Sequence, residues 1–126
     1  PVWSQDVDVA ADSPIKGYSN LMYTFHFYAA THKEMYREKV KAAVKKGLPV
    51  FVSEFGISES SGNGSIDKKE ANTWIQFLKK NKISYVCWSL SNKDESCSLL
   101  KSSSTRTGNF RKTDLSAAGR WYQAVK

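Results

Sequence analysis

Residues 50–55 read VFVSEF, a short apolar run in which a glutamate, Glu54, stands next to Phe55. Two further runs, LMYTFHFY at residues 21–28 and ISYVCWSL at residues 83–90, are rich in aromatic and β-branched residues. Runs of this length and composition predict three strands. Helical patterns follow the strands in turn, and strands that alternate with helices predict a parallel β/α architecture.

The first two helices have recognisable starts. In residues 31–46 apolar residues recur at helical spacing, and Thr31 with Glu34 forms a capping-box pattern. Asp67 can cap a second helix over residues 68–80, whose apolar residues share one face.

Long polar segments follow the second and third strands, at residues 56–66 and 91–113. Segments of such length without their own regular structure usually carry function. Beyond the later one, Ser116 can cap a final helix. In parallel β/α folds the functional groups gather at the C-terminal ends of the strands, where these segments lie.

Side-chain alternation along the strands assigns residues to faces. It places Val52 and Glu54 on one face of their strand, and it brings His26, Tyr28 and Trp88 to the same face as Glu54. A carboxylate at the end of an apolar strand is costly to bury unless it is paired or hydrogen-bonded, so Glu54 is either structural or functional. The other three residues would each fit a core on their own, and it is the gathering of all four that favours a functional site.

Carbohydrate chemistry accounts for this set of residues. The apolar faces of sugar rings stack on flat aromatic side chains, which Trp88 and Trp3 can supply. The polar side chains suited to sugar hydroxyls are Lys93, Glu95 and Gln5. Glycoside cleavage needs two carboxyl groups, and Glu54 is a candidate for one of them.

The 126 residues suffice for one domain, and their net charge is +7. The lysines gather in residues 33–46 and 68–82, where solvated helix faces explain them, and no nucleic-acid motif accompanies them. A basic interaction domain that binds a polyanion remains the alternative from another functional class. Because no nucleic-acid motif is present, nucleic acid is not an expected partner. No apolar run approaches the roughly 18 to 20 residues that span a bilayer, so a membrane is not an expected partner either. Cys87 and Cys97 match no zinc or redox spacing, and a disulfide between them stays open.

The chain resembles glycoside hydrolase family 5, the cellulases with a (β/α)8 barrel. The blocks that carry the resemblance, in the family's order, are WSQDV at 3–7, LMYTFHFYAATH at 21–32, VFVSEFG at 50–56, SGNG at 61–64, WSLSNKDES at 88–96 and TDLSAAG at 113–119. The resemblance implies an α/β fold, the C-terminal part of a TIM barrel, with strands 6–8 and helices 6–8 and a clipped strand 5. Residues 1–126 would form this partial barrel as a single unit.

The resemblance also implies roles for individual residues. Glu54 would be the nucleophile of a retaining endo-β-1,4-glucanase, Tyr28 would orient it and help to keep it ionised, and His26 would contact the sugar beside the cleaved bond. Trp88 would stack under that sugar. Flanking subsites would be lined by Trp3, Gln5, Lys93 and Glu95. The implied substrate is a β-1,4-glucan such as cellulose, no metal or cofactor is expected, and the implied location is outside the cell.

The chain departs from the family in one chemical respect. The family's general acid is a glutamate that follows an asparagine, and no Asn-Glu pair occurs in this sequence. The chain is therefore expected to be a piece of a larger enzyme, a half-barrel that pairs with a second copy of itself, or a non-catalytic sugar-binding module. In the half-barrel, Asp94 and Glu95 would be the candidate substitute acids. A partial barrel exposes sheet edges and interior, so we expect the isolated chain to associate or to be poorly stable.

Overall fold

The computed structural model describes residues 2–125. In chain order the elements are a short 3-10 turn η1 (Val2–Ser4), α1 (Val7–Asp12), β1 (Tyr23–Tyr28), α2 (Glu34–Lys45), β2 (Val50–Gly56), α3 (Lys68–Lys80), β3 (Tyr85–Cys87) and α4 (Ala117–Val125). The strands form one parallel sheet in the order β1-β2-β3. The predicted alternation of parallel strands with helices is thus confirmed.

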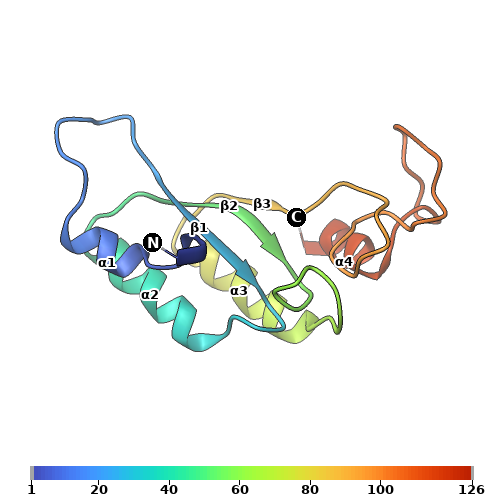
Figure 1. The fold of residues 1–126 in the computed structure, drawn as a ribbon, viewed down its shortest axis with the longest axis horizontal. Coiled ribbons are helices and arrows are strands. Elements are labelled where there is room, and N and C mark those ends of the chain that lie inside the picture. Colours follow the sequence, from blue (N-terminus) through green and yellow to red (C-terminus); the bar gives the residue numbers. More distant parts are fainter. Residues whose placement is uncertain (1, 126) are drawn as a thin grey trace.

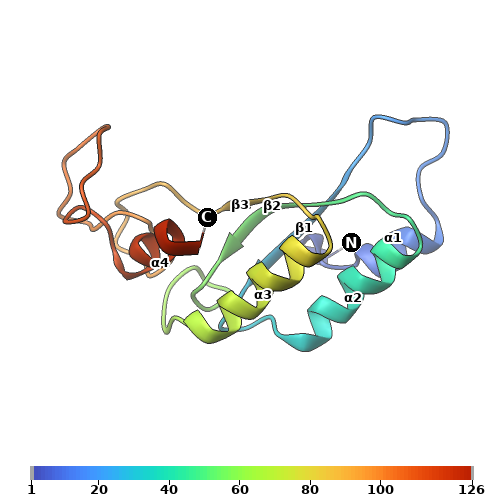
Figure 2. The same ribbon diagram turned by 180° about the vertical axis from the view of Figure 1, so that it is seen from behind.

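Helices α2 and α3 lie side by side along one face of the sheet (Figures 1 and 2). The short α1 packs against α2, and α4 lies at the other end of the molecule, where Trp121 Nε1 donates a hydrogen bond of 2.8 Å to Asn72 Oδ1 of α3. Two loops project from this body, one between α1 and β1 and one before α4 (Figure 1). None of the helices within residues 2–125 is long and apolar enough to cross a membrane.

The core forms between the sheet and α3. Phe25 and Phe27 of β1 are fully buried, and the Phe27 ring stacks on Trp74 of α3 with 3.9 Å between the ring centroids. The Phe55 ring of β2 also stacks on Phe27, with 5.1 Å between the ring centroids. Aromatic stacking therefore fixes β1 and β2 against α3, and the opposite face of the strands is left for polar side chains.

A β-bulge changes which face of β2 carries Glu54. Thr24 pairs with Phe51, and His26 pairs with Glu54, so two steps along β1 oppose three steps along β2. Val52 is fully buried in the core, whereas Glu54 lies beside His26. The prediction that Val52 and Glu54 share a face is therefore wrong, because the extra residue of a bulge reverses the alternation beyond it.

The helix starts agree with the sequence in two cases out of three. Asp67 accepts a hydrogen bond of 2.9 Å from the Glu70 N–H, and Ser116 Oγ accepts one of 3.0 Å from the Gly119 N–H, as predicted. The capping box at Thr31 is wrong, because α2 begins only at Glu34 and follows Lys33, whose side chain makes no cap bond.

Two further elements differ from expectation. The sequence did not predict α1, a helix of six residues that buries only Val7 and so has little apolar periodicity. The third strand is shorter than residues 83–90 and covers only Tyr85–Cys87. Within it the predicted alternation holds, since Tyr85 and Cys87 pack against the core while Val86 is exposed.

Candidate active site

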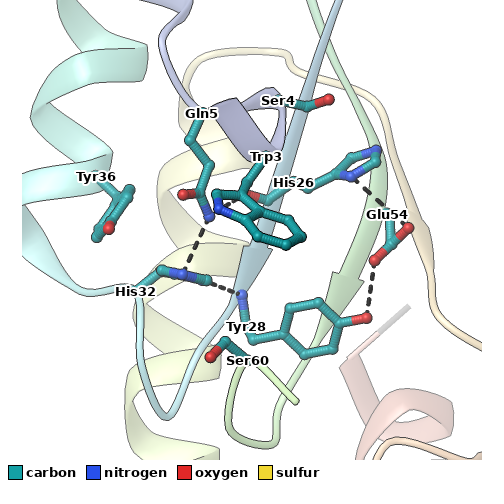
Figure 3. A pocket seen from close by; sticks show the side chains of 9 residues that line it. All are labelled: Trp3, Ser4, Gln5, His26, Tyr28, His32, Tyr36, Glu54 and Ser60. Atoms are coloured by element: carbon teal, nitrogen blue, oxygen red, sulfur yellow. Dashed lines mark hydrogen bonds and ion pairs between the residues drawn. The ribbon is translucent and has the colours of Figure 1, made fainter. Parts of the chain in front are cut away.

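A cleft of about 700 Å³ opens at the C-terminal ends of β1 and β2 (Figure 3). It is lined by Trp3, Ser4, Gln5, His26, Tyr28, His32, Tyr36, Glu54 and Ser60. These residues come from the N-terminal segment, from both strands, from the loops that follow them and from the first turn of α2. Distant parts of the sequence thus converge at the end of a parallel sheet, where such folds carry their chemistry.

Glu54 is the carboxylate of this cleft, with 25% of its side chain exposed. Its Oε1 accepts a hydrogen bond of 2.8 Å from the Tyr28 hydroxyl (Figure 3). Burial raises the pKa of Tyr28, and the bond to Glu54 raises it further, so the phenol keeps its proton and remains a donor. This hydrogen bond fixes the orientation of the Glu54 carboxylate.

His26 lies on the other side of the carboxylate. Its Nδ1 is 3.7 Å from Glu54 Oε2, and its Nε2 is 2.9 Å from Ser53 Oγ. The bulge is what turns Ser53 and Glu54 toward the same histidine. Oε2 therefore lies beside a polar ring, while Oε1 is held by Tyr28.

His32 lies beneath these residues and is almost completely buried. Its Nδ1 accepts a hydrogen bond of 2.8 Å from the Tyr28 backbone N–H. An imidazole nitrogen that accepts carries no proton, so the ring proton is on Nε2, which lies 3.1 Å from the Gln5 amide nitrogen. Both of these nitrogens carry hydrogen, so a hydrogen bond between the two side chains forms with the Gln5 amide turned to present its oxygen to Nε2. Burial lowers the pKa of His32, which agrees with a neutral ring.

The structure brings five of the eight predicted site residues together in the cleft: Trp3, Gln5, His26, Tyr28 and Glu54. Trp88 follows β3 outside the lining of this cleft, and its backbone N–H donates a 2.8 Å hydrogen bond to the Phe55 carbonyl. Lys93 and Glu95 form an ion pair of 2.6 Å in the loop beyond Trp88. The hydrogen bond to Glu95 raises the pKa of Lys93.

Sequence reasoning missed His32 and Ser53. Assigning Thr31 to a helix cap placed His32 inside a helix, whereas it belongs to a tight turn in which the Thr31 and His32 N–H groups both donate to the Tyr28 carbonyl. The signal was present as YAATH at residues 28–32, where a histidine closely follows a strand end. Ser53 had no such signal, because only the bulge turns it toward His26.

Both cysteines are free thiols in the structure, which answers the open question of a disulfide. Burial raises the pKa of Cys87 to about 12, and burial also raises that of Cys97. Within residues 2–125 no group of three His, Cys, Asp or Glu side chains is arranged to hold a metal ion.

Comparison with known proteins shows the family to which the chain belongs. The family model for cellulase, glycosyl hydrolase family 5, matches residues 1–94. An endoglucanase of Clostridium saccharobutylicum is 46% identical over 117 residues, which make up 93% of this chain and 26% of that protein.

Solved structures agree in fold as well as in sequence. The cellulase Cel5C_n has a TM-score of 0.91 at 42% identity, over 98% of this chain and 38% of that one. The catalytic domain of Thermobifida fusca endoglucanase Cel5A in complex with cellotetraose has a TM-score of 0.82 at 31% identity, over 92% of this chain and 38% of that one. The chain therefore spans less than half the length of these relatives, and it belongs to the cellulase family, glycosyl hydrolase family 5, a family of TIM barrels.

Proposed function

We propose that this protein acts in the hydrolysis of β-1,4-glucans with retention of configuration, and that Glu54 is the nucleophile. The observation that carries the proposal is the held carboxylate that lines the cleft, whose Oε1 accepts from Tyr28 while Oε2 lies beside His26. The names of the relatives, endoglucanases and one complex with cellotetraose, support a glucan as the substrate.

In the first step Oε2 of Glu54 attacks the anomeric carbon. The bond from that carbon to the leaving oxygen breaks, the leaving oxygen takes a proton from a general acid, and a glycosyl ester on Glu54 remains. In the second step the general acid, now deprotonated, takes a proton from a water molecule, whose oxygen attacks the same carbon from the opposite side and releases the Glu54 carboxylate. Two displacements at one carbon restore its configuration.

The other residues of the cleft bind and orient the sugar. We propose that His26 contacts the sugar at the cleavage point and that Trp3 and Gln5 serve a flanking subsite. Trp88, Lys93 and Glu95 would extend the binding surface along the loop after β3, with Trp88 as the stacking platform.

The general acid has no counterpart in the sequence of this chain, which contains no Asn-Glu pair. We propose that it comes from a part of the barrel outside these 126 residues, so that β1, β2 and β3 are barrel strands 6, 7 and 8, with their helices. A second copy of the chain that contributes Asp94 or Glu95 is the alternative. Because cellulose lies outside cells, we also propose that the protein is secreted.

Covalent trapping of Glu54 tests the nucleophile without the acid. A 2-deoxy-2-fluoro-β-cellobioside that carries a dinitrophenolate leaving group needs no protonation, and its fluorine slows the second step so that the ester accumulates. We expect a single cellobiosyl adduct by intact-protein mass spectrometry, mapped to the peptide that contains Glu54. Glu54→Gln should give no adduct. The matched control Glu59→Gln, a fully exposed carboxylate nearby whose bonds go to Ser65, should label like the unmodified chain.

The outcomes separate the candidate functions. An unlabelled chain that still binds cello-oligosaccharides would be the non-catalytic module, and an adduct on any residue other than Glu54 would overturn the assignment. A chain that is labelled but leaves carboxymethyl-cellulose intact has its acid elsewhere. A chain that is labelled and also hydrolyses this polymer carries its own acid, to be sought with Asp94→Asn and Glu95→Gln.

A further inference from the structure

Within residues 2–125 no strand lies on the side of β1 to which the Tyr28 backbone N–H points. Successive amides of a strand point to opposite sides, and the next amide, Ala29 N–H, donates to the Gly56 carbonyl of β2. The Tyr28 N–H therefore points away from β2 at the outer side of β1, the first strand of the sheet. A buried N–H without an acceptor is strongly unfavourable, and Nδ1 of His32 supplies the acceptor at 2.8 Å.

The Tyr28 ring is also held in place, by close packing against Gly56. A Cβ atom at Gly56 would lie 2.7 Å from Cδ1 and Cε1 of Tyr28, so the ring lies directly against the backbone of β2. The φ of Gly56 is not positive, so close approach of the ring explains the glycine. The phenol is thus supported underneath by Gly56 and held at its backbone by His32.

Three neighbouring residues fix the position of His32, whose Nδ1 is the acceptor. The Trp74 indole N–H donates a 2.7 Å hydrogen bond to the His32 carbonyl, and the edge of the imidazole meets the Tyr36 ring with 4.6 Å between centroids. The Gln5 amide lies against Nε2, with 3.1 Å between the two nitrogens, and the Tyr28 N–H at Nδ1 sets the tautomer (Figure 3). His32 therefore presents a lone pair at Nδ1 in one orientation.

We infer that His32 is a positioning residue for the nucleophile and that it acts through Tyr28. The Tyr28 hydroxyl stands at the far end of a long side chain, so a small rotation of its backbone removes it from Glu54 Oε1. His32 prevents this rotation with one hydrogen bond, and among the described residues no hydrogen bond or ion pair joins it to Glu54. The catalytic consequence rests on the proposed role of Glu54, whereas the link from His32 to the Tyr28 hydroxyl does not.

Two amide variants of His32 distinguish the contact made by Nδ1 from the contact made by Nε2. In His32→Asn the amide oxygen takes the position of Nδ1 and still accepts from the Tyr28 N–H. In His32→Gln the amide reaches toward Gln5 and leaves that N–H without its acceptor. His32→Leu removes both contacts. Thermal unfolding of each variant reports stability separately from positioning.

The first readout is the kinetics of Glu54 labelling by the fluorinated cellobioside. We expect the limiting labelling rate to fall about tenfold in His32→Gln and His32→Leu, the loss that follows from one hydrogen bond of about 1.4 kcal/mol, and to stay near the original in His32→Asn. The half-saturating reagent concentration should change little. The double variant Tyr28→Phe/His32→Leu should be no slower than Tyr28→Phe alone, because both changes remove the same hydroxyl contact. Additive losses in this cycle would show that His32 acts by another route and would overturn the inference.

The second readout does not depend on catalysis. The 13C resonance of the Tyr28 ring carbon that bears oxygen, assigned from its absence in Tyr28→Phe, reports the hydrogen bond to Glu54. Glu54→Leu defines its position when the bond is lost. We expect His32→Leu and His32→Gln to move the resonance most of the way to that position and His32→Asn to leave it in place. An unchanged resonance in folded His32→Gln would overturn the inference, even if the chain were never labelled by the cellobioside.

Discussion

The His32 ring lies between the Gln5 amide and the Tyr28 backbone, and the bond from the Tyr28 N–H requires an unprotonated Nδ1. Protonation would place two N–H groups against each other. The side chains that face the ring, Gln5 and Tyr36, offer no negative charge to compensate. Burial therefore lowers the pKa of His32 below the ordinary histidine value of 6.5.

This shift makes stability depend on pH. Between the folded-state pKa of His32 and the unfolded-state value near 6.5, the unfolded chain binds the extra proton. The His32 contribution to the free energy of unfolding is then complete above about pH 6.5 and is lost as the pH falls toward the folded-state pKa. Urea titrations between pH 8 and pH 5 should show a steeper loss for the unmodified chain than for His32→Asn, which cannot titrate. Parallel curves would contradict a buried neutral histidine.

At the scale of single elements, α3 depends on its cap. Asp67 accepts from the Glu70 N–H and forms an ion pair of 3.0 Å with Lys33, in which the lysine side chain is largely exposed. Asp67→Ala removes the cap, and we expect the free energy of unfolding to fall by about 1 kcal/mol. Asp67→Asn keeps the cap oxygen and removes only the exposed charge pair, so its loss should be smaller. Chemical denaturation measures both, and equal losses would mean that the charge, and not the cap, stabilises the start of α3.

The same scale shows what the sequence can predict. Strong apolar periodicity located α2, α3 and the three strands, and short polar side chains located the caps at Asp67 and Ser116. Alternation found the cluster of His26, Tyr28 and Glu54 but placed Val52 on the wrong side. The alternation rule assumes a regular strand, whereas β2 is bulged, with Val52 and Phe55 both packed in the core. Tertiary contacts determine where a strand forms a bulge, and they also determine the role of His32, so neither could be predicted from the sequence.

At the scale of the whole molecule, one face of the sheet is uncovered by the helices of the described chain. Val86 is 52% exposed on this side, Trp88 just beyond β3 is 49% exposed, and β1 and β3 are the outer strands of the sheet. Apolar side chains beside unpaired strand edges favour association with another sheet. The net charge of +7 opposes association through long-range repulsion, and salt weakens that repulsion.

We therefore expect the 126-residue chain to associate, and more strongly as salt is added. Sedimentation velocity over a range of concentrations should show species larger than the 14.2 kDa monomer. Val86→Glu places a charge on the open face and should shift the distribution toward monomer. Val9→Glu, the same substitution at an exposed position on α1, should not. Without association the open face leaves the chain poorly stable, so the informative contrary result is a monodisperse monomer that melts cooperatively at high salt. That result would mean that the sheet edges and the face with Trp88 are stable in water, and it would remove the physical reason for a partner that completes the barrel.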